Sequence, residues 1–83
     1  MYTCPVCGYE KLYEPAYNKY GYGSHEICPC CGYQFGYDDD DQGISHEEYR
    51  NNWLKSGAKW FDASTKPDNW DAKTQLLRIG IKL

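Results

Sequence analysis

The sequence predicts an α+β fold, in which a cysteine-rich β unit is followed by two short helices. The phrase CPVCGY at residues 4–9 returns almost unchanged as CPCCGY at residues 28–33. Residues 1–37 are rich in tyrosine and glycine, a composition typical of short strands joined by tight turns. After residue 43, two segments combine apolar residues at helical spacing with residues that cap helices.

The length of 83 residues predicts a single domain, in which a unit over 1–37 carries a helical part over 44–83. A domain this small buries only about 60% of its unfolded surface, so a metal, disulfides or a partner usually stabilises it. The five cysteines form an odd set, which argues against closed disulfide pairing.

Residues 1–27 lack the long apolar run of a secretory signal, and no apolar stretch is long enough to cross a bilayer. We therefore expect a cytoplasmic, reducing environment, where paired CxxC motifs more often bind metal than form disulfides. The lack of a membrane-spanning stretch also means that no membrane partner is expected. The formal net charge is −3 and the nine basic residues are scattered, which disfavours binding to nucleic acid.

The β unit is expected to be a zinc-ribbon-like hairpin. Strands are predicted at residues 2–3 and 9–13, on either side of the first cysteine phrase. Residues 15–24 have the composition of an exposed turn. The acidic run DDDD at residues 38–41 is predicted to be a solvated loop, because adjacent carboxylates repel one another.

The first helix is expected from about His46 to Ser56. Ser45 is a favourable N-cap, and Glu48 three residues later completes a capping box. Gly57 provides the stop signal. Residues 58–69 should then form a connection anchored by two aromatic side chains.

The second helix is expected close to the C-terminal end of the sequence. Asp68 or Asn69 is the predicted cap, and Gly80 the predicted stop. The residues that fall at helical spacing are Trp70, Thr74, Leu77 and Ile81, the last of which follows the predicted stop.

The repeated phrase predicts a metal site with the spacing C-x2-C-x20-C-x2-C, formed by Cys4, Cys7, Cys28 and Cys31. In each copy, proline fixes φ after the first cysteine, and glycine after the second permits a left-handed turn. Four thiolates close the shell of a zinc ion, so we expect a structural metal whose binding contributes to folding.

The fifth cysteine, Cys30, aligns with Val6 and is therefore expected to point away from the metal. Its predicted role is that of a small apolar filler or a surface thiol, and a redox sensor is the sharper alternative. Of the two histidines, only His25 is an alternative metal ligand. His25 lies three residues before Cys28, but both it and His46 are predicted to be surface residues.

The phrases CPVCG and CPCCG resemble zinc-ribbon knuckles. More closely, the chain resembles the bacterial cysteine-rich CPCC family through CPVCGY, EICPCCGYQFGYDDDD, GISHEEYRNNW and NWDAKTQLLRI. The resemblance covers nearly the whole chain and implies the same four cysteine ligands, but it implies no reaction.

Two rival interpretations remain open. A rubredoxin-like iron site for electron transfer is suggested by YTCPVCGY, because four cysteines can hold iron as well as zinc. A thiol-redox protein is suggested by CPCC, although such a motif should begin a helix. No catalytic arrangement of side chains can be assembled from the sequence, so an enzyme is not predicted.

The expected role is that of a module that binds another protein. Tyr17, Tyr20 and Tyr22 lie in the predicted exposed turn, and exposed tyrosines favour interfaces. The sequence leaves the partner, the pathway and the oligomeric state open.

Overall fold

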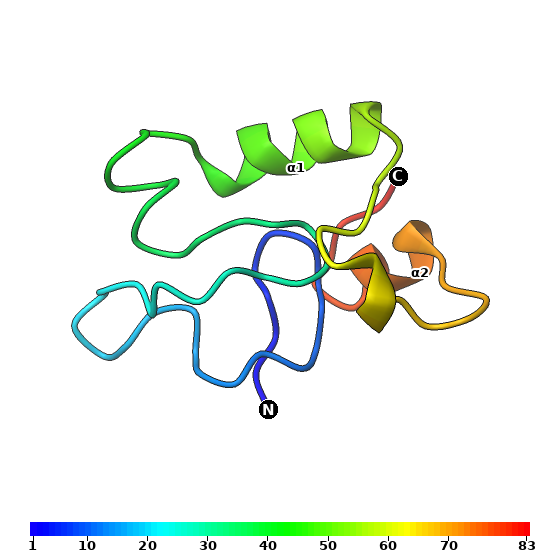
Figure 1. Ribbon diagram of the computed structural model, residues 1–83. Helices are drawn as coiled ribbons and strands as arrows, with labels where there is room; N and C mark the ends of the chain where they lie inside the picture. The colour runs from blue at the N-terminus through cyan, green and yellow to red at the C-terminus, as the bar shows by residue number, and fades with distance from the viewer.

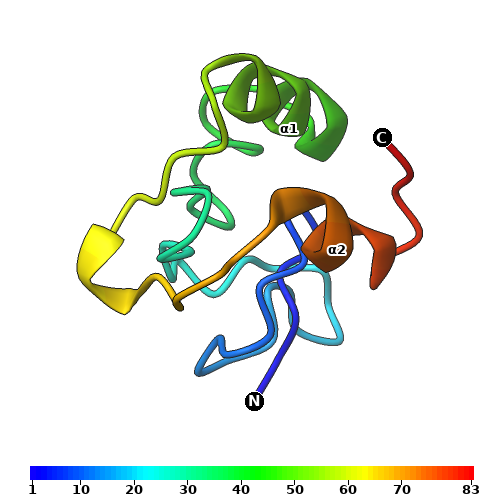
Figure 2. The same cartoon turned by 90° about the vertical axis from the view of Figure 1, so that its right-hand side faces the viewer.

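The structure is a computed structural model that describes residues 1–83. It contains the helices α1 (His46–Lys55) and α2 (Ala72–Leu77), with a 3-10 helix, η1 (Ala63–Thr65), between them. In Figure 1 the first half of the chain runs as loops, and α1 lies along one side of them. Figure 2 shows α2 between α1 and the N-terminal loops. None of the helices has the length and apolar character that crossing a bilayer requires.

The predicted zinc-ribbon-like hairpin is wrong. The structure has no β-sheet, and its antiparallel pairing is limited to three isolated bridges: Tyr2 with Leu12, Tyr17 with Gly23, and Ile27 with Gln34. The strands predicted at residues 2–3 and 9–13 are reduced to the first of these bridges.

The hydrogen bonds of the first cysteine turn, residues 4–9, explain this difference. The backbone N–H of Cys4 donates to the carbonyl of Tyr9 at 2.7 Å, and that of Gly8 donates to the carbonyl of Cys4 at 2.9 Å. These groups are used inside the turn and cannot pair with a neighbouring strand.

The second cysteine turn, residues 28–33, repeats the first. The backbone N–H of Cys28 donates to the carbonyl of Tyr33 at 3.0 Å, and that of Gly32 donates to the carbonyl of Cys28 at 2.8 Å. A single bridge lies outside each turn. The repeated phrase therefore specifies two equivalent closed turns rather than two strands of a sheet.

Helix α1 confirms the prediction for this segment to within one residue. The Oγ atom of Ser45 accepts a hydrogen bond from the N–H of Glu48 at 3.1 Å, as an N-cap should. The helix ends at Lys55, and Gly57 follows with φ +101, the left-handed conformation that favours glycine.

Helix α2 is shorter than predicted, and both predicted caps are wrong. Its N-cap is Asp71, whose carboxylate accepts from the N–H of Thr74 at 2.9 Å. Asn69 instead adopts φ 58 and redirects the chain before the helix. Trp70 precedes this N-cap and lies outside the helix, and its indole N–H donates to the side chain of Gln75 at 2.9 Å.

The acidic loop is only partly solvated. Asp40 and Asp41 are exposed, but Asp38 and Asp39 are half-buried. A carboxylate oxygen of Asp38 accepts from the N–H of Gln34 at 2.8 Å, which folds the chain back on itself. The first two aspartates therefore stabilise a turn, and the next two face solvent.

The core is built around the cysteines. Among its other members, Leu12, Tyr33, Phe35 and Leu76 are fully buried. The core cluster consists of Cys4, Val6, Cys7, Leu12, Ala16, Cys28, Cys30, Cys31, Tyr33, Phe35, Trp53 and Leu76.

Gly8 supplies a direct test of the contact between α2 and the first cysteine turn. A Cβ atom at Gly8 would lie 2.6 Å from the carbonyl oxygen of Gln75, whereas one at Gly21 would meet nothing within 4 Å. Both glycines have positive φ, +88 and +83 respectively. We expect Gly21→Ala to lower the free energy of unfolding by about 1 kcal/mol through backbone strain alone. Gly8→Ala should lower it by about 3 kcal/mol, because the clash adds to the strain.

Urea unfolding at a fixed free-metal concentration measures both values. Equal losses for the two variants would contradict the close contact at Gly8.

Candidate metal centre

Four cysteine sulfurs meet in the interior of the protein. The Sγ atoms of Cys4, Cys7, Cys28 and Cys31 all lie within 4.8 Å of one another, and all four residues are buried. The Cys4–Cys31 and Cys7–Cys28 sulfur distances are 3.9 and 3.6 Å. In a tetrahedral zinc site with bonds of about 2.3 Å, neighbouring sulfurs lie about 3.8 Å apart. The arrangement therefore fits a single tetrahedral metal ion.

Burial makes it unfavourable for these four thiols to ionise together. The hydrogen bond between Cys7 and Cys28 raises the pKa of the Cys7 thiol. Hydrogen bonds with Cys31 and other cysteines lower the pKa of the Cys28 thiol. Without a cation, the protons are therefore shared unequally within the group, because several buried thiolates would repel one another. A divalent cation removes this penalty and permits all four thiols to ionise.

Cys30 lies outside the group of four. Its side chain is fully buried, with a relative solvent exposure of 0%, and Val6 at the equivalent position of the first turn is buried to the same extent. The Nε2 atom of Gln75 lies 3.4 Å from its sulfur. Of the roles predicted for Cys30, a buried filler fits the structure, and a surface thiol is wrong.

Donors from the second half of the chain contact the first cysteine turn. Arg50 donates from Nε to the carbonyl of Val6 at 2.6 Å and from Nη2 to that of Pro5 at 3.1 Å. The Nε2 atom of Gln75 donates to the carbonyl of Cys7 at 2.9 Å. Three consecutive carbonyls of this turn are thus hydrogen-bonded by two side chains.

The second cysteine turn is held at the equivalent positions. Asp62 and Phe61 donate their backbone N–H groups to the carbonyls of Pro29 and Cys30, at 2.9 and 3.0 Å. The Oη atom of Tyr49 donates to the next carbonyl of the turn, at 3.0 Å. Sequence reasoning missed all of these contacts, because each joins residues far apart in the chain and no local pattern marks them.

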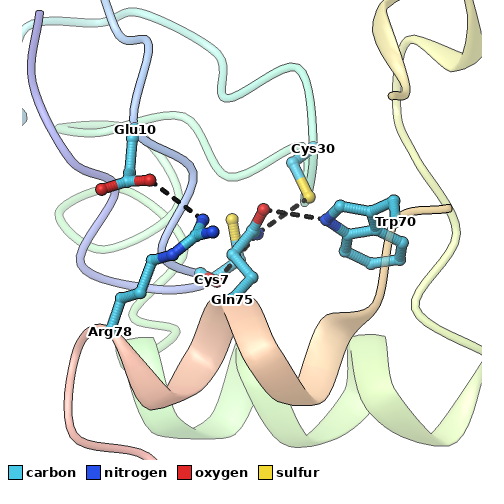
Figure 3. A network of polar contacts seen from close by, with 6 residues as sticks. All are labelled: Cys7, Glu10, Cys30, Trp70, Gln75 and Arg78. Carbon is cyan, nitrogen blue, oxygen red and sulfur yellow. Dashed lines mark hydrogen bonds and ion pairs between the residues drawn. The ribbon is translucent and has the colours of Figure 1, made fainter. Parts of the chain in front are cut away.

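Figure 3 shows how Gln75 connects α2 to this centre. Its side chain reaches from the helix toward Cys7 and Cys30, and its Oε1 atom accepts from the indole N–H of Trp70. Only 5% of Gln75 is exposed, so both ends of its amide are satisfied within the protein. An ion pair between Arg78 and Glu10, 2.9 Å long, lies beside this network.

The histidines are not part of the cysteine group. The prediction that His46 is a surface residue is wrong, since it is half-buried and its Nε2 atom lies 2.8 Å from the Oη of Tyr17. Tyr17 also donates to the carboxylate of Asp39, and the ring of Tyr33 packs edge-on against His46. This cluster joins α1 to the acidic loop.

The environment of His46 predicts a pH dependence. Burial lowers its pKa below the ordinary value of 6.5, the charge of Arg50 lowers it further, and Asp39 opposes both. A depressed pKa contributes stability that is present above about pH 6.5 and is lost as the pH falls through the folded-state value. We expect wild-type protein to lose more stability than His46→Gln between about pH 7 and about pH 5.5.

Urea titrations of both proteins at several pH values measure this difference, since the cysteines titrate equally in the two. Parallel pH profiles would contradict the prediction.

The chain is similar to two proteins of Bacillus subtilis (strain 168). It is 34% identical to the uncharacterized protein YoaQ over 70 residues, which covers 68% of this chain and 59% of that protein. It is 28% identical to the uncharacterized protein YozI over 83 residues, with 82% and 69% covered. The chain thus spans about three fifths of the length of the first relative. No family model and no solved structure matches the chain, so membership of the CPCC family stays a prediction.

Proposed function

We propose that this is a small metal-binding protein in which Cys4, Cys7, Cys28 and Cys31 bind one zinc ion. The observation that carries the proposal is the meeting of four buried sulfurs at distances suited to a tetrahedral ion. Zinc is favoured because four thiolates complete its shell, and because it needs no redox partner in a reducing compartment such as the cytoplasm.

The proposed role of the ion is structural. A shell filled by four cysteines leaves no position for water or substrate, so the ion supplies cohesion rather than chemistry. It would join two turns that are separated by twenty residues, and its binding free energy would contribute to folding. Residues 1–83 would then fold as one domain around this centre.

Iron is the second candidate for the same site. Four thiolates at these distances also suit an iron ion, which would make the protein a rubredoxin-like electron carrier. The thiol-redox alternative has less support. Residues 28–33 form a closed turn rather than the start of a helix, and Cys30 is buried.

A protein partner is the second part of the proposal. Tyr20 and Tyr22 are 71% and 69% exposed at one end of the molecule and lie beside each other. Tyr17, the third tyrosine of the predicted surface, is half-buried and hydrogen-bonded within the protein. The proposed surface is therefore reduced to two residues.

The neighbouring residues Cys30 and Cys31 provide a matched test of the metal site. We expect wild type and Cys30→Ser to bind one zinc ion per chain. Removing a residue that only hydrogen-bonds to a metal ligand lowers metal affinity by up to roughly 100-fold. Cys31→Ser removes a proposed ligand itself, so its zinc affinity should fall by more than this. Native mass spectrometry and elemental analysis measure the metal ratio, and a red iron-loaded sample would favour the electron-transfer alternative. Equal zinc loss in both variants would contradict the assignment of Cys30 as a filler.

The tyrosine surface is tested by the double variant Tyr20→Ser with Tyr22→Ser. A partner that wild type captures should bind at least about ten-fold more weakly, because exposed aromatic residues contribute most to such interfaces. Tyr13→Ser is the control, since Tyr13 is 84% exposed but lies away from this turn in sequence. Isothermal titration with the captured partner gives the affinities. Unchanged binding by the double variant would remove this surface from the proposal.

A further inference from the structure

The proposed metal ligands and the groups that hold their turns come from different halves of the chain. The four sulfurs belong to residues 4–31, and the six donors to the turn carbonyls belong to residues 49–75. The donors reach equivalent carbonyls in both turns. The second half of the chain is therefore fitted to one relative placement of the two turns.

That placement depends on the sulfurs. Each turn is closed by its own hydrogen bonds, but no sheet fixes one turn against the other. A metal ion bound to two sulfurs from each turn would set their distance and orientation. A change in that placement would separate some of the six carbonyls from their donors, and an unpaired buried carbonyl is unfavourable.

Charge supports the same coupling. Arg50 makes no ion pair. The one salt bridge of this structure joins Arg78 to Glu10. Its guanidinium instead lies on the carbonyls of Pro5 and Val6, within the first cysteine turn. Four thiolates with one divalent ion carry a net charge of −2, since −4 + 2 = −2. The cation of Arg50 therefore lies on the backbone of the turn that carries Cys4 and Cys7, where it would offset part of this net charge.

We propose that residues 44–83 form a metal-dependent cap that docks on the two cysteine turns when the ion is bound and loosens when it leaves. Tyr49, Arg50 and Gln75 are the positioning residues that slow the loss of the ion. The inference rests on the proposed metal-binding function and adds its regulation: metal occupancy and the exposed surface of the cap change together. By linkage, each stabilises the other to the same extent.

The chain contains its own reporters for this coupling. Its three tryptophans, Trp53, Trp60 and Trp70, all belong to the cap, whereas the proposed ligands all precede residue 32. Trp53 is buried and Trp70 is bonded to Gln75. Undocking of the cap would expose these rings to water, and their fluorescence would then shift to longer wavelength.

The experiment adds excess chelator to zinc-loaded protein and follows two signals: zinc release, by a colorimetric chelator, and tryptophan emission. We expect both signals to change at the same rate. Tyr49→Phe should accelerate release about five-fold, because it removes one hydroxyl and no volume. Arg50→Gln and Gln75→Glu should accelerate it about ten-fold or more, as loss of such supporting residues does.

Matched controls separate positioning from general destabilisation. Tyr13→Phe removes a hydroxyl that faces solvent, and Lys55→Gln removes a charge from the same helix as Arg50. Both should release zinc within about two-fold of wild type. Arg50→Lys keeps the charge but loses the two-pronged donor and should fall between wild type and Arg50→Gln. In cobalt-loaded protein, the thiolate-to-cobalt absorption should shift in the positioning variants and stay unchanged in the controls.

The outcomes distinguish this inference from the proposed function. Zinc release without a change in tryptophan emission would overturn the metal-dependent cap, while metal binding by the protein would stand. Release from the positioning variants at the control rate would overturn their assigned role in the same way. A protein that binds neither zinc nor cobalt would overturn the proposed function and the inference together.

Discussion

Four cysteine sulfurs meet in the interior of this protein, and both cysteine turns are arranged around them. Five of the twelve core residues are cysteines, so the centre of the protein is built from small, polarisable side chains. Such a core offers little apolar area compared with one made of large aliphatic residues. A metal ion held by the sulfurs would supply the cohesion that so small a hydrophobic core lacks.

Closed turns take the place of regular structure around this centre. Of the 38 backbone hydrogen bonds, 30 lie outside the helices, in turns, loops and caps. Each cysteine turn is closed by two of its own backbone hydrogen bonds, and three of its other carbonyls accept hydrogen bonds from the second half of the chain. The fold is therefore two matched turns with a helical cap, rather than a sheet with helices packed against it.

Two separate contacts attach α1 to the first half of the chain. At one, Tyr49 and Arg50 bond to the carbonyls of the cysteine turns. At the other, His46 packs among Tyr17 and Tyr33 beside the acidic loop. Tyr33 is also the last residue of the second cysteine turn, so both contacts attach α1 to the cysteine turns.

The local features of this protein could be predicted from its residue order. Proline and glycine in CPxCG specified each turn, the repeat grouped Cys4 with three other cysteines, and Ser45 marked the start of α1. The packing of the whole chain decided three further features: the absence of a hairpin, the burial of Cys30 and the start of α2 at Ala72. It also decided that Arg50 bonds to a turn 44 residues away. A turn or a cap depends on neighbouring residues and leaves a pattern in the sequence, whereas a contact between distant segments depends on how the whole chain packs.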